Sequence, residues 1–218
     1  MTDNKSNASD SRSQSPSDIG IPVNTSRRRL TGAGLGMSAI FTLASRPVLA
    51  VECTSASAAA SGNLSHHGNP PQCEGRTPGY WKNPENRGNG KFWPDGYEQG
   101  NCTGEGCSSS PENWTGGTPF HSKFSGDNFK IDNVSLSLNQ VMILNDNSYK
   151  GVSDPYNLGA HIAAALLNAA SGKTKDVLTE AQVINIWNEC QNPGFFQPIA
   201  GIEWTPAQVV TYLKSTMI

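Results

Sequence analysis

The sequence has little charge, few cysteines and no long hydrophobic run. Charged residues make up 16% of its 218 positions, against roughly a quarter in an average soluble domain. The formal net charge is -2, so the chain lacks the basic surface that nucleic-acid binding requires. A long coiled coil needs more charge and a heptad repeat. Five cysteines are too few for a disulfide-dense miniprotein. No apolar run approaches the roughly 18–20 residues of a membrane span.

Residues 1–50 have the pattern of an export signal. Residues 1–24 are polar and typical of a disordered segment. The order Ser26-Arg27-Arg28-Arg29-Leu30 resembles the twin-arginine export motif, and a mild, glycine-broken apolar stretch follows. The general secretory route and a short buried helix are the alternatives. We expect cleavage after Ala50, which removes six basic and three acidic side chains and leaves a net charge of about -5.

The rest of the chain divides by composition into three parts. Residues 51–72 are rich in Ser, Ala and Gly and predict a flexible linker. Residues 73–218 are expected to form a single domain. Within it, residues 73–133 hold eleven glycines and nine of the seventeen aromatics without a sustained period. We expect this loop-rich segment to pack on a scaffold through its aromatic side chains.

Residues 134–218 predict the helical scaffold. Three Ser/Thr-x-x-Gln capping boxes begin at Ser137, Thr179 and Thr205. A fourth helix is expected from about Asp154 to Ala170, and its nearly all-apolar sequence predicts a central buried position. The predicted fold is therefore mainly α: a small bundle of about four helices, with one short β-element at 134–138.

The segment Thr77-Pro-Gly-Tyr-Trp-Lys-Asn-Pro84 resembles a motif of uncharacterised secreted and surface proteins of bacteria. Those proteins typically read Gly-Tyr-Trp-Lys-Asn-His-Pro after a cysteine, followed by a Leu-rich helix and an Ala-His-x-x-Ala-Ala-x-Leu-Asn segment. Here 138–144 and 160–168 correspond to the two later pieces, whereas the His before Pro84 is missing and 87–117 is a long insertion. The resemblance implies export and a shared fold, and it implies no activity.

The cysteines predict disulfides in an oxidising compartment. Cys102 and Cys107 are spaced for a short local loop, and Cys73 is expected to pair with Cys190. Cys53 is then left over. The alternative is a structural metal held by the other four cysteines, although Cys-x4-Cys is only half of a zinc signature. No metal or other cofactor is predicted.

Six residues are candidates for ligand binding: Tyr80, Trp81, Trp93, Trp114, His121 and His161. Trp81 suits either a stacking face or core packing. Trp93 and Trp114 lie in the insertion and are expected to be exposed, which makes them the stronger candidates. His161 lies on the apolar helix, where a hydrogen-bonded core histidine is the usual role, with a site shared with His121 as the alternative.

No nucleophile, nucleotide-binding or HExxH zinc motif is present. The sequence therefore favours an exported, non-catalytic secreted or cell-surface module that binds a glycan or a surface protein. A small periplasmic enzyme or metal-binding protein using His121 and His161 is the competing hypothesis.

Overall fold

The computed structural model describes residues 53–62, 71, 73–83, 93–144 and 148–218. The chain divides into two units, Met1–Ala44 and Ser45–Ile218, and every described residue belongs to the second. The proposed leader lies outside the described residues. No helix in the described ranges is both long and apolar enough to cross a membrane.

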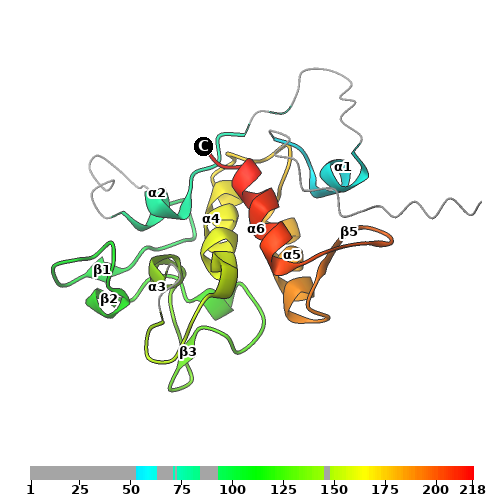
Figure 1. The fold of residues 1–218 in the computed structure, drawn as a ribbon. Helices are drawn as coiled ribbons and strands as arrows, with labels where there is room; N and C mark the ends of the chain where they lie inside the picture. Colours follow the sequence, from blue (N-terminus) through cyan, green and yellow to red (C-terminus); the bar gives the residue numbers. More distant parts are fainter. Residues whose placement is uncertain (1–52, 63–70, 72, 84–92, 145–147) are drawn as a thin grey trace, which may run out of the picture. The chain divides into compact units, whose positions relative to one another are not determined.

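Short helices and short hairpins alternate along the second unit (Figure 1). The α-helices are α1 (Ala56–Ser61), α2 (Pro78–Lys82), α3 (Leu138–Leu144), α4 (Leu158–Ala170), α5 (Glu180–Gln191) and α6 (Pro206–Ser215). The 3₁₀ turns are η3 (Pro111–Asn113), η4 (Phe120–Ser122) and η5 (Pro155–Asn157). The strands are β1 (Asn101–Cys102), β2 (Trp114–Thr115), β3 (Lys130–Ile131), β4 (Val134–Ser135), β5 (Phe196–Ile199) and β6 (Ile202–Trp204).

The prediction of a mainly α bundle is wrong. The part of the chain that the structure describes holds six α-helices and three two-stranded antiparallel sheets, with 43% helix and 14% strand, so the fold is mixed α/β. The sheets pair β1 with β2, β3 with β4 and β5 with β6. Most of these strands have only two residues, which is too short to leave an alternating pattern in the sequence. β4 does lie where the short β-element was expected.

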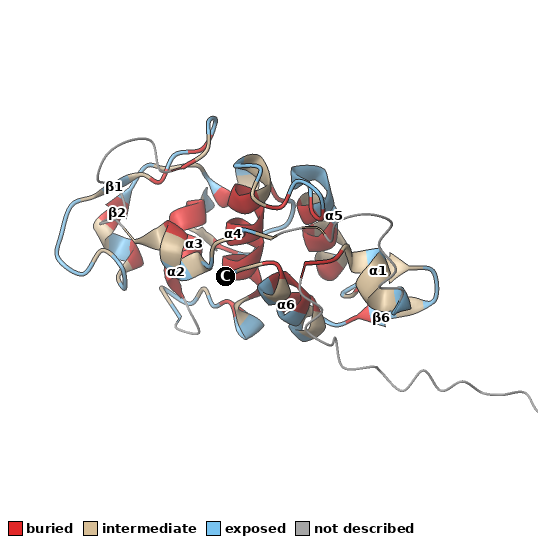
Figure 2. Cartoon of the chain, turned by 90° about the horizontal axis from the view of Figure 1, so that it is seen from above, coloured by how far each residue is buried: buried red, intermediate tan, exposed pale blue. Residues whose placement is uncertain are grey.

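Helix α4 is the centre of the core. All of its residues from Leu158 to Asn168 are buried, as its sequence predicts, and α3, α5 and α6 all pack against it. Figure 2 shows the buried residues concentrated on α4 and on the inner faces of its neighbours. At Gly159 a Cβ would lie 3.0 Å from Val141 Cγ1 and closer still to the ring of Phe129. Glycine is therefore required where α4 meets the loop-rich segment.

Aromatic side chains attach the loop-rich segment to the helices. The ring centroid of Phe120 lies 4.5 Å from that of Phe124, 4.9 Å from that of Phe129 and 5.0 Å from that of Trp187 on α5. All four rings are buried. Aromatic pairs at these distances add to the free energy gained from burial alone, so this cluster fixes residues 120–129 on the scaffold.

Residues 51–72, expected to be a flexible linker, include α1 and two buried residues. Cys53 and Thr54 are 6% and 1% exposed. The Tyr212 hydroxyl of α6 donates to the Thr54 carbonyl oxygen at 3.3 Å, and α1 packs against β5. This N-terminal segment therefore belongs to the folded domain.

Candidate binding groove

The Gly-Tyr-Trp segment docks on the central helix through one buried amide. Trp81, on α2, is 1% exposed, and its indole N–H donates to Asn168 Oδ1 at 3.0 Å. The same amide bonds both backbone groups of Arg76, accepting from its N–H at 2.7 Å and donating to its carbonyl at 2.9 Å. Trp81 is thus a packing residue. Tyr80 is half-buried, with the Arg76 guanidinium 5.2 Å from its ring centroid.

The backbone carbonyl of Trp81 in turn fixes the segment that follows. It accepts a hydrogen bond from the indole N–H of Trp93 at 3.1 Å and another from the Gln99 amide at 3.1 Å. Trp93 is only 7% exposed. The expectation that it is an exposed ligand platform is wrong, because its indole N–H is used to close residues 93–99 over α2.

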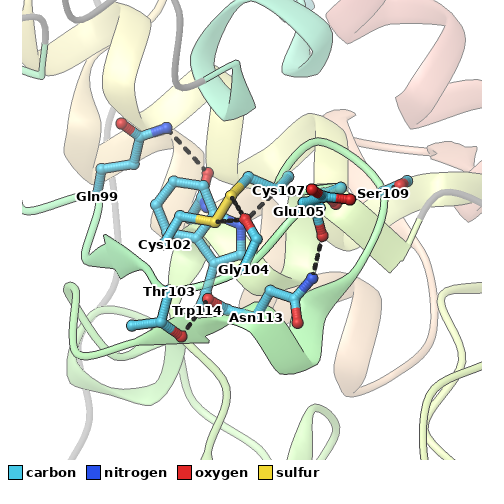
Figure 3. Close-up of a disulfide and its surroundings, with 11 residues drawn as sticks. Gln99, Cys102, Thr103, Gly104, Glu105, Cys107, Ser109, Asn113 and Trp114 are labelled. Atoms are coloured by element: carbon cyan, nitrogen blue, oxygen red, sulfur yellow. Dashed lines mark hydrogen bonds between the residues drawn. A yellow bond between two sulfur atoms is a disulfide. The ribbon is translucent and has the colours of Figure 1, made fainter.

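Trp114 is also buried, at 3% exposure, contrary to expectation. Its indole N–H donates to the Cys107 carbonyl at 2.6 Å, and its own carbonyl accepts from the Gln140 amide at 3.2 Å. The predicted Cys102–Cys107 disulfide is confirmed, with the Cα atoms 5.9 Å apart. Figure 3 shows this disulfide, Trp114 and Asn113 gathered in one loop, where the Asn113 amide donates to the Glu105 carbonyl.

The other predicted pairing is wrong. Cys73 bonds Cys53, with the Cα atoms 5.2 Å apart, and Cys190 is a buried free thiol. Cys190 faces the core from α5, where burial, and secondarily the Glu189 charge, raises its pKa to about 12. The four-cysteine metal hypothesis is excluded with it, because three of those cysteines are in disulfides.

A groove of about 790 Å³ lies between residues 93–101 and residues 116–119. This volume is within the range of ligand-binding pockets. Its polar side chains include Asp95, Glu98, Asn101 and Thr118, all at the surface or half-buried. The aromatic side chains that line it are Trp93 and Tyr97. We call this site the β1–β2 groove.

Glycines set the shape of the β1–β2 groove. A Cβ on Gly100 would lie 2.8 Å from the Thr115 carbonyl oxygen, and one on Gly117 would lie 2.8 Å from the Gln99 carbonyl oxygen. Both residues also have positive φ, 92° and 85°, which L side chains rarely adopt. The two walls are tied by Thr118, whose N–H donates to the Glu98 carbonyl at 2.8 Å and whose hydroxyl accepts from the Glu98 N–H at 2.8 Å.

Tyr97 joins the groove to α5. Its hydroxyl donates a short hydrogen bond to the Glu180 carboxylate, and the Lys123 ammonium lies 4.5 Å from its ring centroid. Burial, together with the Glu180 hydrogen bond and charge, raises the Tyr97 pKa well above its ordinary value. The sequence analysis did not single out Tyr97, Glu98 or Asn101 as ligand-binding residues. The available signal was the mixture of aromatic, amide and carboxylate side chains between glycines.

The two candidate histidines bond separate backbone segments. The His121 ring nitrogens lie 3.0 Å from the Phe124 carbonyl oxygen and 3.3 Å from the Asn128 carbonyl oxygen. His161 is 9% exposed, with Nδ1 2.7 Å from the Asn157 carbonyl oxygen. Within the described ranges, no group of three or more His, Cys, Asp or Glu side chains is placed to hold a metal ion. The structure thus gives the His121–His161 site no geometry on which to build chemistry.

Comparison with known proteins finds no matching family model, no matching curated protein and no matching solved structure.

Proposed function

We propose that this protein is an exported binding module that holds a glycan in the β1–β2 groove. The observation that carries the proposal is the groove itself: about 790 Å³, with two aromatic rings and four polar side chains in its lining. Sugars present apolar C–H faces and many hydroxyl groups. A groove that combines aromatic surface with carboxylate, amide and hydroxyl groups offers partners for both.

The rigidity of the groove supports binding rather than a loose surface contact. Residues 93–99 are fixed by two hydrogen bonds to the Trp81 carbonyl, and β1 leads directly into the Cys102–Cys107 loop. A site that is already ordered before ligand binding loses less conformational entropy when the ligand arrives. Because Trp93 and Tyr97 are 7% and 8% exposed, their rings offer edges to a ligand rather than open faces.

Export of the module is supported by the sequence of residues 1–50 and by the two disulfides, since disulfides persist mainly in oxidising compartments. The resemblance to secreted and surface proteins of bacteria agrees with this destination. N-terminal sequencing of the protein recovered outside the cytoplasm tests the route. A first residue close to Val51 supports the proposal, and an intact Met1 in all fractions contradicts it.

Binding is tested with the disulfide-bonded protein on an array of oligosaccharides, followed by calorimetry with the best ligand. We expect Asn101→Ala to weaken that affinity about threefold to tenfold, because one exposed amide that lines the groove is lost. Thr115→Ala is the matched control: Thr115 pairs with Asn101 across the ribbon and is exposed, but it does not line the groove. Equal affinities for the wild type and both variants would refute this site.

A further inference from the structure

The charges that line the β1–β2 groove are all of one sign. Asp95 and Glu98 are its charged side chains, both exposed, and no lysine, arginine or histidine is found among the described residues that line it. A concave surface with one sign of charge concentrates ligands of the opposite sign and repels those of the same sign. The groove is therefore electrostatically negative, beyond the general excess of acids in the chain.

The groups behind the groove leave this sign unchanged. Glu180 places a third carboxylate at the hydroxyl of Tyr97. The cation that contacts this wall is Lys123, whose ammonium lies over the Tyr97 ring at 4.5 Å. Lys123 thus offsets one of three carboxylates. A ligand in the groove meets a net negative field, with the aromatic edges of Trp93 and Tyr97 beside it.

We infer that the glycan held by the β1–β2 groove is an amino sugar chain with free, protonated amines, and that acidic sugars are rejected. The inference rests on the proposed function and adds the class of ligand. Ammonium groups donate hydrogen bonds to carboxylates with charge assistance, while the apolar faces of the sugar rings lie against the aromatic edges. N-acetylated sugars keep the shape of the ligand and lose the charge, so they should bind with intermediate affinity.

The experiment compares three tetrasaccharides of glucosamine, N-acetylglucosamine and galacturonate with the wild-type protein at about pH 5.5, where the Asp and Glu carboxyl groups are ionised and the sugar amines are protonated. Calorimetry at low salt is expected to give the glucosamine chain about fivefold to tenfold higher affinity than the N-acetylated chain. The galacturonate chain should bind weakest. Raising the salt to about 500 mM should reduce the glucosamine advantage, because the carboxylates are exposed and screened.

The double variant Asp95→Asn/Glu98→Gln keeps the size of both side chains and removes their charge. It is expected to bring the affinities of the glucosamine and N-acetylglucosamine chains within about twofold of each other. Glu105→Gln/Glu112→Gln is the matched control, since these exposed carboxylates belong to the adjoining loop and lie outside the groove lining. This control should keep the wild-type preference.

The outcomes separate the two proposals. If the N-acetylated chain binds as tightly as the glucosamine chain and the double variant changes nothing, the charge preference is overturned while glycan binding stands. If a lysine tetrapeptide competes as strongly as the glucosamine chain, the groove recognises cations and the sugar class is overturned. If none of the three sugars binds, the proposed function fails together with the inference.

Discussion

Asn168 shows how one residue connects parts of the chain that are far apart in sequence. Its side chain is 0% exposed and makes three hydrogen bonds, to the two backbone groups of Arg76 and to the indole of Trp81. These contacts join α4 to α2 across about ninety residues of sequence. The later and the earlier piece of the resemblance therefore meet in space, and their contact has a structural purpose.

We predict that Asn168→Ala lowers the free energy of unfolding by about 2–4 kcal/mol, because Trp81 and Arg76 are left with unsatisfied buried polar groups. Urea denaturation followed by tryptophan fluorescence measures this loss. Asn185→Ala is the control, since Asn185 is exposed and bonds Glu189 on its own helix. If the two variants lose equal stability, the buried amide does not hold α2 in place.

The same scale shows where sequence reasoning was insufficient. The sequence left Trp81 open between core and site, and it expected Trp93 and Trp114 to be exposed. The deciding facts are the acceptors of their indole N–H groups: Asn168 Oδ1 for Trp81 and backbone carbonyls for the other two. Such acceptors come from distant segments or from loop backbone, and a single sequence does not display them.

At the scale of elements, helix starts were predictable and hairpins were not. The boxes beginning at Thr179 and Thr205 are confirmed, each with reciprocal side-chain and backbone hydrogen bonds to a Gln three residues on. Ser137 and Gln140 bond each other in the same way ahead of α3. A capping box is local, so the sequence contains all of its information. In contrast, β5 and β6 pair Phe196 with Trp204, where contact across the hairpin matters more than any period.

We predict that Thr205→Ala lowers the free energy of unfolding by about 1 kcal/mol through loss of the α6 cap. Thr205→Ser keeps the hydroxyl and should lose only a few tenths of that amount. Thermal unfolding followed by circular dichroism distinguishes the two. Because Thr205 is exposed, a loss of the same size in both variants would mean that the methyl group, and not the cap, stabilises the helix start.

The folded domain extends further towards the N-terminus than composition suggests. Residues 51–72 are low in complexity, yet Cys53 is bonded to Cys73, and α6 and β5 contact the segment between Thr54 and Ser61. In the loop-entropy model, a crosslink over 20 residues stabilises the folded state by about 3 kcal/mol. The sequence pointed to Cys190 as the partner because both Cys73 and Cys190 adjoin predicted structure. It had no signal for the packing of Thr54.

Buried groups that must stay neutral predict how the whole molecule responds to alkali. Burial raises the pKa of Tyr212 far above its ordinary value and that of Cys190 from 9.0 to about 12. The pKa of Tyr97 is raised as well. Above about pH 9 the unfolded chain therefore releases protons that the folded domain retains, and stability falls as pH rises. Lys82, whose pKa is lowered by burial, opposes this trend over a narrower range, since its unfolded form keeps the proton.

Urea midpoints at about pH 8, 9.5 and 10.5 should accordingly decrease, with a slope of up to about 1.4 kcal/mol per pH unit for each fully buried group. Tyr212→Phe and Cys190→Ala remove one titrating group each, so each should flatten part of the curve: Cys190→Ala from about pH 9 and Tyr212→Phe from about pH 10. Tyr149→Phe is the control, because Tyr149 lies half-buried outside the α6 interface. A wild-type curve that stays flat to pH 10.5 would contradict the neutral, buried state of these groups. A decrease that both variants share unchanged would place its origin elsewhere in the chain.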